Sequence, residues 1–321
     1  MRAISAGLLL SVLVTVSALS AHQGAAGPGA VRLGEPVERI LWVDPDDPSR
    51  FDFQYGVGGS ELQPQPPFRF LSEDLSRSTP KANIVDGRGF NWNIKWGIEA
   101  GPSAFCTRLI RACGYLAEAE YFLDEGRLEG VRNLTRARRH VSEDGSFEDA
   151  RFQLRAESPK YLDGHHWTLK KNPFLGTPEF QGLKILILLL SNWDTRESNF
   201  GIFLDSSGNR QRYLYVHTDW GAALGHWGNA FTRTKGECRD FAEQTTGFVK
   251  GLDHGVVKWG FGDMHDIRVA DVRWILQYLG EITDAQLRLG LASSGKSPQE
   301  ADCYTRALRQ RIVQLREVAD R

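Results

Sequence analysis

The pattern between residues 181 and 221 places the strongest constraint on how this chain of 321 residues folds. A run of apolar residues, 183–190, predicts a buried helix. It leads directly into the polar segment 191–199, which reads NWDTRESN from its second residue. The sequence therefore predicts a core helix that ends in a polar loop.

Two short strand-like runs, 200–204 and 213–217, follow this loop and are separated by turn-forming residues. They predict a β-hairpin, and a hairpin brings its two ends together. We therefore expect Asn199, before the first strand, to lie near Asp219, after the second.

The spacing of polar residues in this region carries the functional signal. Asp194 is followed by Arg196 two positions later and by Asn199 five positions later, and the hairpin then leads to the segment TDWG, which contains Asp219. The segment NWDTRESN resembles the HRDxKxxN catalytic loop of protein kinases, and TDWG resembles their DFG turn.

The chemistry of phosphoryl transfer explains why these residue types are needed. A carboxylate near the acceptor hydroxyl orients it and takes its proton, which suits Asp194. A nearby cation neutralises oxygens of the transferring group, which suits Arg196. Asn199 and Asp219 offer oxygen atoms to a divalent metal ion, Mg²⁺ or Mn²⁺, that bridges the phosphates of ATP.

A second predicted hairpin, formed by residues 81–85 and 90–95, supplies a lysine. Its apolar residues Phe90, Trp92 and Ile94 alternate with polar ones, so Lys95 projects from the opposite face. Kinase folds keep the lysine that contacts the α and β phosphates at this place. A surface lysine on a sheet edge is the alternative interpretation.

The segment before this hairpin has donors that suit phosphates. Ser78, Thr79 and Lys81 offer hydroxyl, amide and ammonium groups. The glycine-rich segment 56–59 is an alternative phosphate loop, although ordinary turn formation explains it equally well.

Taken together, these motifs resemble atypical kinases of the phosphatidylinositol 3-kinase-like and HipA type, and in particular a set of exported bacterial proteins with that fold. The similarity covers roughly residues 65–320. It implies an α+β, bilobal, protein-kinase-like fold, with a small β-rich lobe containing one helix at residues 37–125 and a larger, mainly helical lobe at 126–321. ATP would lie between the lobes.

Two departures from the kinase pattern matter. The helix predicted from Pro102 to about Tyr115 has no acidic residue in its first turn to pair with Lys95, which leaves Glu99, Glu118 and Glu120 as candidates. Trp193 replaces the arginine that precedes the catalytic aspartate in many protein kinases, so we expect no activation through a phosphorylated loop paired with that arginine.

The sequence is compatible with three functions. The first is an exported, metal-dependent phosphotransferase with a nucleotide donor and an unknown protein, sugar, lipid head group or small-molecule acceptor. The second is a pseudokinase-type binding or scaffold protein, and the third is a nucleotidyl (AMP) transferase on the same fold. Lysine plus arginine (39) nearly balance aspartate plus glutamate (40), which argues against a nucleic-acid partner.

The N-terminus predicts export. Met1 and Arg2 precede an apolar run, 3–18, and small residues follow it, as in a secretory signal peptide at residues 1–21. Residues 22–36 read as a flexible tether. We expect a secreted or periplasmic protein without a stable membrane span after cleavage; an uncleaved anchor is the alternative.

Four cysteines are available for disulfides in an oxidising compartment. Cys106 and Cys113 would lie about 10 Å apart along one helix, so they cannot bond to each other. Two crosslinks from them to Cys238 and Cys303, or buried free thiols, both remain open. The charged segment 132–160 reads as a solvated, antiparallel or loop-rich insert.

Overall fold

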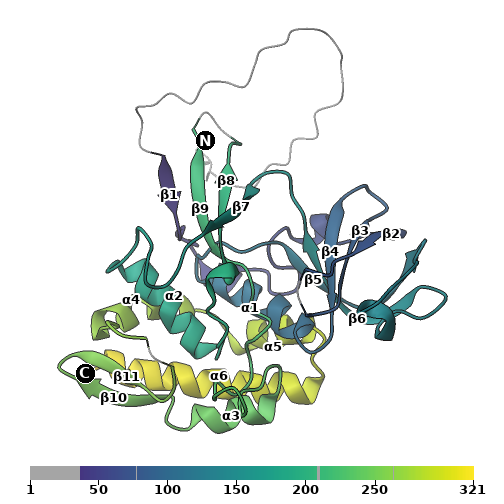
Figure 1. The fold of residues 1–321 in the computed structure, drawn as a ribbon. Coiled ribbons are helices and arrows are strands. Elements are labelled where there is room, and N and C mark those ends of the chain that lie inside the picture. The colour runs from purple at the N-terminus through teal and green to yellow at the C-terminus, as the bar shows by residue number, and fades with distance from the viewer. Residues whose placement is uncertain (1–36, 77, 208–209, 263) are drawn as a thin grey trace, which may run out of the picture. The chain divides into compact units, whose positions relative to one another are not determined.

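The computed structural model describes residues 37–76, 78–207, 210–262 and 264–321. The predicted signal peptide (1–21) and tether (22–36) lie outside these residues. The mixed α+β class is confirmed, and the chain from Val37 to Arg321 forms one compact unit (Figure 1). Across the described part of the chain, no helix combines the length and apolar character that a membrane crossing requires.

Five strands close into a barrel in the order β2-β3-β4-β6-β5 (Figure 1). They are β2 (Phe68–Glu73), β3 (Lys81–Val85), β4 (Asn91–Trp96), β5 (Glu120–Glu129) and β6 (Ser146–Leu154). The predicted hairpin of β3 and β4 is confirmed, with Lys81 opposite Lys95. Alternation along β4 buries Trp92, Ile94 and Trp96 in the barrel core and turns Lys95 to the other face.

The charged insert contains an antiparallel strand, which was one of the two predictions, but this strand is not the solvated surface that was expected. Its residues 146–154 form β6, which pairs with both β4 and β5 and is largely buried. The charged residues of this strand lie among alternating apolar ones, and the segment is therefore a wall of the barrel rather than a solvated surface. The predicted boundary between residues 125 and 126 falls within β5, while the division into two lobes stays a prediction.

A second sheet has the order β1-β9-β8-β7. Its strands are β1 (Glu38–Ile40), β7 (Lys160–His166), β8 (Phe200–Asp205) and β9 (Arg212–His217). The predicted hairpin after the polar loop is β8–β9, in which Phe200 pairs with His217. A small two-stranded sheet consists of β10 (Val249–Asp253) and β11 (Val256–Trp259).

The helices bury most of the remaining apolar residues. They are α1 (Ala100–Ala112), α2 (Pro178–Leu189), α3 (Cys238–Thr245), α4 (Val269–Leu279), α5 (Asp284–Ala292) and α6 (Pro298–Ala319). α2 is buried along nearly its whole length, in keeping with its largely apolar sequence, and α6 packs against α3, α4 and α5. Ser297 precedes α6 and forms a capping box: its hydroxyl accepts from the Glu300 amide, and the Glu300 carboxylate accepts from the Ser297 amide. Four short 3-10 turns complete the fold: Pro48–Arg50, Ser60–Leu62, Ala137–Arg139 and Glu197–Asn199.

A disulfide joins Cys238 on α3 to Cys303 on α6, and Cys106 and Cys113 are buried free thiols. The two crosslinks considered from the sequence therefore do not form. The bond closes a loop of 65 residues, and a loop of that size should contribute about 4 kcal/mol to the free energy of unfolding.

Removing the disulfide is the first test of this structure. We expect the double variant Cys238→Ser, Cys303→Ser to lose about 4 kcal/mol of unfolding free energy in urea titrations. Adding a reductant should lower the stability of the native protein toward that of the variant. Unchanged stability after complete reduction of the cystine would contradict this expected contribution of the disulfide.

Candidate functional site

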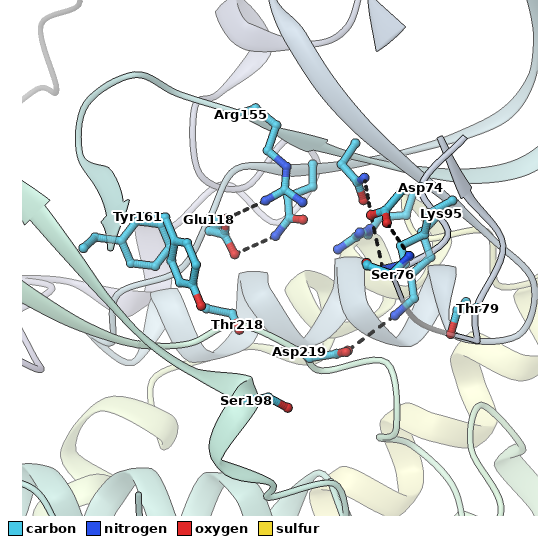
Figure 2. A pocket seen from close by; sticks show the side chains of 15 residues that line it. Asp74, Ser76, Thr79, Lys95, Glu118, Arg155, Tyr161, Ser198, Thr218 and Asp219 are labelled. Atoms are coloured by element: carbon cyan, nitrogen blue, oxygen red, sulfur yellow. Dashed lines mark hydrogen bonds and ion pairs between the residues drawn. The ribbon is translucent and has the colours of Figure 1, made fainter. Parts of the chain in front are cut away.

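A pocket of about 290 Å³ lies where the outer face of the barrel meets residues from the second sheet (Figure 2). The barrel contributes side chains of β3, β4 and β6 and of the segment that follows β2. Ser198, Thr218 and Asp219 come from the two ends of the β8–β9 hairpin. Four of the predicted site residues line this pocket: Thr79, Lys81, Lys95 and Asp219.

Lys95 forms the centre of the polar contacts. Its Nζ lies 2.6 Å from Oε2 of Glu99 and 3.4 Å from Oδ1 of Asp219, which is 124 positions away in the sequence. The lysine is almost fully buried, at 4% exposure, so both contacts lie away from bulk water. Of the three acids left open by the sequence, Glu99 is thus the partner of Lys95.

Glu99 precedes α1 and binds three groups at once. Besides Lys95, it accepts a hydrogen bond from the Thr79 hydroxyl (3.1 Å) and pairs with Lys235, a residue of the segment after Asp219. Burial favours the neutral acid, but the charge of Lys95 and the bonds from both lysines outweigh it and lower the pKa of Glu99. The Glu99 carboxylate therefore fixes the position of the Lys95 ammonium and links it to the segment that carries Lys235.

Asp219 is held as a carboxylate. Burial again opposes ionisation, but the positive charge of Lys95 and a hydrogen bond from the Gly221 amide (3.0 Å) lower the pKa of Asp219. A Cβ atom at Gly221 would lie 2.8 Å from Cβ of Glu99 and 3.1 Å from Nζ of Lys95. The glycine of TDWG is therefore required by the close approach of the backbone to this ion cluster.

The β8–β9 hairpin brings Asn199 next to the segment that contains Asp219, as its register requires. The Thr218 amide donates to the Asn199 carbonyl at 2.8 Å, directly beyond the pair formed by Phe200 and His217. Asn199 is fully buried, and its side-chain nitrogen donates to the Asp194 carbonyl at 3.0 Å. Asn199 therefore joins the polar loop to the end of the hairpin and also holds the backbone of Asp194 within that loop.

The predicted catalytic residues Asp194 and Arg196 bind each other. The guanidinium contacts both carboxylate oxygens, with Nε at 2.6 Å from Oδ1 and Nη2 at 2.5 Å from Oδ2. The hydrogen bonds and charge of Asp194 raise the pKa of Arg196. The Arg196 side chain is 70% exposed and that of Asp194 only 12%, and neither lines the pocket. They lie in the same loop as Ser198, which does line it.

The predicted phosphate-binding segment is only partly assembled at the pocket. Thr79 and Lys81 line it, whereas Ser78 is exposed and outside the lining. Lys81 forms an ion pair with Asp74 (3.5 Å), which also accepts from the Ser76 amide. Burial alone would raise the pKa of Asp74, but the bonds from Ser76 and the charge of Lys81 lower it to about 2.

Sequence reasoning missed the polar wall formed by β6. Arg151 lies opposite Lys95 in the strand register and Gln153 lies opposite Asn93, and all four side chains line the pocket. Arg151 Nη1 lies 2.5 Å from Glu120, which accepts a second bond from Ser103 on α1. Arg151, Gln153 and Arg155 occur at every second position. Had this segment been interpreted as a strand, this spacing would have predicted a polar face.

Comparisons with known proteins find similarity to solved structures alone. No family model and no curated protein matches the chain. The solved structures that match include the crystal structure of a Helicobacter pylori proinflammatory kinase, CtkA, with a TM-score of 0.48 and 11% sequence identity. The match covers 79% of this chain and 96% of that one. A similarity of this degree establishes no shared activity, and the function proposed next depends on the residues of the pocket.

Proposed function

We propose that this protein is a metal-dependent phosphotransferase that uses a nucleotide donor. The observation that carries the proposal is the contact of Lys95 with both Glu99 and Asp219 inside one polar pocket. A buried lysine beside two carboxylates offers a fixed positive charge to phosphate oxygens, and the acids keep that charge in place. The motif resemblance supplies the reaction class, and this cluster supports it.

The residues present fit a divalent ion that arrives with the nucleotide. Asp219 is ionised and lines the pocket, while Asn199 is fully buried outside the lining, next to Thr218, and carries an amide oxygen. Oxygen ligands are those that Mg²⁺ and Mn²⁺ prefer. No three His, Cys, Asp or Glu side chains gather as a metal cluster in the described part of the chain. Mg²⁺ typically takes one or two protein oxygens and completes its shell with water and substrate phosphates, so such a cluster is not required. The ion would neutralise phosphate charge during transfer.

Asp194 and Arg196 are assigned to the acceptor side of the reaction. In this proposal Asp194 receives the proton of the acceptor hydroxyl, while Arg196 turns from that carboxylate toward oxygens of the transferring group. The high exposure of Arg196 permits this movement, because little packing holds its guanidinium. Nucleotidyl transfer in place of phosphoryl transfer would be recognised by the mass of the modified acceptor.

Export to the periplasm or medium belongs to the same proposal. The signal-like N-terminus motivates it, and the Cys238–Cys303 disulfide supports it because such bonds persist in oxidising compartments. Mass spectrometry of the protein from culture supernatant and periplasm would test it. A chain recovered intact from the cytoplasm, starting at Met1, would contradict it.

Nucleotide binding is the first test of the proposed function. At a nucleotide concentration of about 100 times Kd, with Mg²⁺ or Mn²⁺, we expect the melting temperature to rise by about 5–10 °C. In the Lys95→Met variant this rise should largely disappear, because the phosphates lose their buried counter-charge. Each variant is compared with its own nucleotide-free melting curve.

Lys250→Met is the matched control, since this lysine is exposed on β10 and lies outside the pocket lining. The control should keep the full thermal shift. A native protein that shows no shift with any nucleotide and either metal would remove the proposed function, leaving the scaffold alternative.

A further inference from the structure

Glu118 and Arg155 lie at one end of the pocket, away from Thr79 and Lys95 (Figure 2). Glu118 Oε2 accepts a hydrogen bond from the Gln153 side-chain amide at 2.6 Å. Arg155 Nη1 lies 3.9 Å from Oε1 of the same carboxyl. The role proposed for Lys95 and Asp219 leaves these three side chains without a function.

Their position relative to Lys95 fits the length of a nucleotide. Arg151 lies opposite Lys95 in the sheet, and Gln153 is two residues further along β6. Two residues of an extended strand span about 7 Å. If Lys95 contacts the first phosphates, the Glu118–Gln153 pair lies one strand repeat further along the pocket, on the side where the sugar and base would continue.

The same end of the pocket offers a stacking surface. Tyr161 on β7 and Phe203 on β8 both line it, with ring centroids 5.2 Å apart. Aromatic side chains bind the faces of all bases with little selectivity. Selection between bases must then come from polar groups that meet the base edge.

The polar groups match guanine. An ionised carboxylate only accepts hydrogen bonds, and the edge of guanine presents two adjacent donors, N1–H and the N2 amino group. Its O6 is an acceptor, which suits the guanidinium of Arg155. Adenine presents a donor and an acceptor at the corresponding edge, so its N1 lone pair would face the carboxylate unpaired.

We propose that Glu118, oriented by Gln153 and flanked by Arg155, reads the base edge of the donor nucleotide and that its ionised form selects guanine over adenine. This inference rests on the proposed function, because it requires that the pocket binds a nucleotide with its phosphates at Lys95.

The protonation of Glu118 makes the selection depend on pH. Burial raises the pKa of Glu118 to about 7. Arg155 and Arg151, both from β6 or its end, lower this pKa, whereas Glu120 on β5 and Asp219 raise it. A protonated carboxyl both donates and accepts, so it loses its match to guanine and matches adenine. The preference for guanine should therefore increase with pH.

Calorimetric binding of GDP and ADP, with Mg²⁺ present, tests the inference on the whole protein. At about pH 8 we expect GDP to bind the native protein about tenfold to a hundredfold more tightly than ADP, with the ratio falling toward pH 6. Glu118→Gln imitates the protonated acid, so it should favour ADP at both pH values. Glu125→Gln, an exposed acid on β5 outside the lining, should retain the native ratio and its pH dependence.

The outcomes separate the two proposals. If neither GDP nor ADP binds, this inference fails, and the proposed function fails with it when no other nucleotide binds with Mg²⁺ or Mn²⁺. If both nucleotides bind with equal affinity, or if Glu118→Gln leaves the ratio unchanged, only the base assignment fails. Should Glu118→Gln not fold, Gln153→Leu removes the amide that orients Glu118 and is expected to reduce the preference for GDP; an unchanged preference would overturn the assignment.

Discussion

Replacing Asp194 by asparagine is expected to slow group transfer by about a thousandfold, within the range that a positioned general base contributes. Asparagine has nearly the same shape but accepts no proton at neutral pH, so nucleotide binding at Lys95 should persist while turnover is lost. The change also removes a surface ion pair with Arg196, which typically contributes less than about 1 kcal/mol to stability. The variant should therefore fold normally.

The measurement uses a nucleotide labelled on its terminal phosphate, incubated with the protein and a periplasmic or culture extract. Release and transfer of the label are both counted, because the acceptor is unidentified. Glu197→Gln is the matched control, since this acid lies three positions away in the same loop and is exposed. Equal label transfer by native protein and Asp194→Asn would show that Asp194 is not the base.

The orientation of Lys95 and the proximity of Asn199 to Asp219 could be predicted from the sequence, because both depend on interactions between residues close in the chain. Alternation along residues 90–95 predicts that Lys95 faces away from the aromatic core, and the structure confirms it. Hairpin geometry predicts that Asn199 approaches the segment of Asp219, and the register of β8 and β9 has this consequence. Their roles in binding a metal stay predictions.

The acidic partner of Lys95 could not be predicted from the sequence. Glu99, Glu118 and Glu120 are all acids within 25 positions of Lys95, and no periodicity distinguishes them. The helix α1 begins at Ala100, earlier than its proline suggests, so Glu99 is its N-cap residue and lies in the short connection from β4, where it contacts Lys95. Glu120 is instead taken by Arg151, a residue of the strand that was read as a solvated insert.

Long-range pairing explains the remaining differences. β6 reads as surface because its charged residues are frequent. Glu148 and Asp149 are indeed exposed, whereas Arg151 and Gln153 are buried and line the pocket. Cys238 and Cys303 lie on helices that pack together only in the folded chain. Both features depend on which segments meet, and single-sequence patterns describe each segment alone.

Replacing Arg311 by methionine is expected to cost about 3–5 kcal/mol of unfolding free energy, a large share of the stability of a typical domain. Arg311 lies on α6 and is completely buried. It donates to the carbonyls of Leu189 (2.7 Å) and Phe241 (2.8 Å) and to the hydroxyls of Ser191 and Thr245. No ion pair joins it to an acid among the residues that the structure describes, and burial lowers its pKa.

These bonds make Arg311 the connection between the last helix and the start of the loop that contains Asp194. Ser191 has a φ of 52°, a strained value for a residue with a side chain, and Arg311 binds both its hydroxyl and the end of α2. Methionine fills the space and stacks on Phe241 but donates nothing, so two buried carbonyls lose their bond from Arg311. A lysine has a compact charge that cannot span three elements, and Arg311→Lys should therefore recover little stability.

Urea unfolding of Arg311→Met and of Arg306→Met, an exposed arginine on the same helix, measures the effect. The control should change stability by less than about 0.5 kcal/mol. Group transfer is then assayed at a temperature where Arg311→Met remains folded. If the guanidinium positions the loop of Asp194 as well as the core, group transfer by the folded variant is also reduced. Full activity in a folded but destabilised variant would show that Arg311 stabilises the core without positioning the loop. Unchanged stability would contradict the contacts of Arg311.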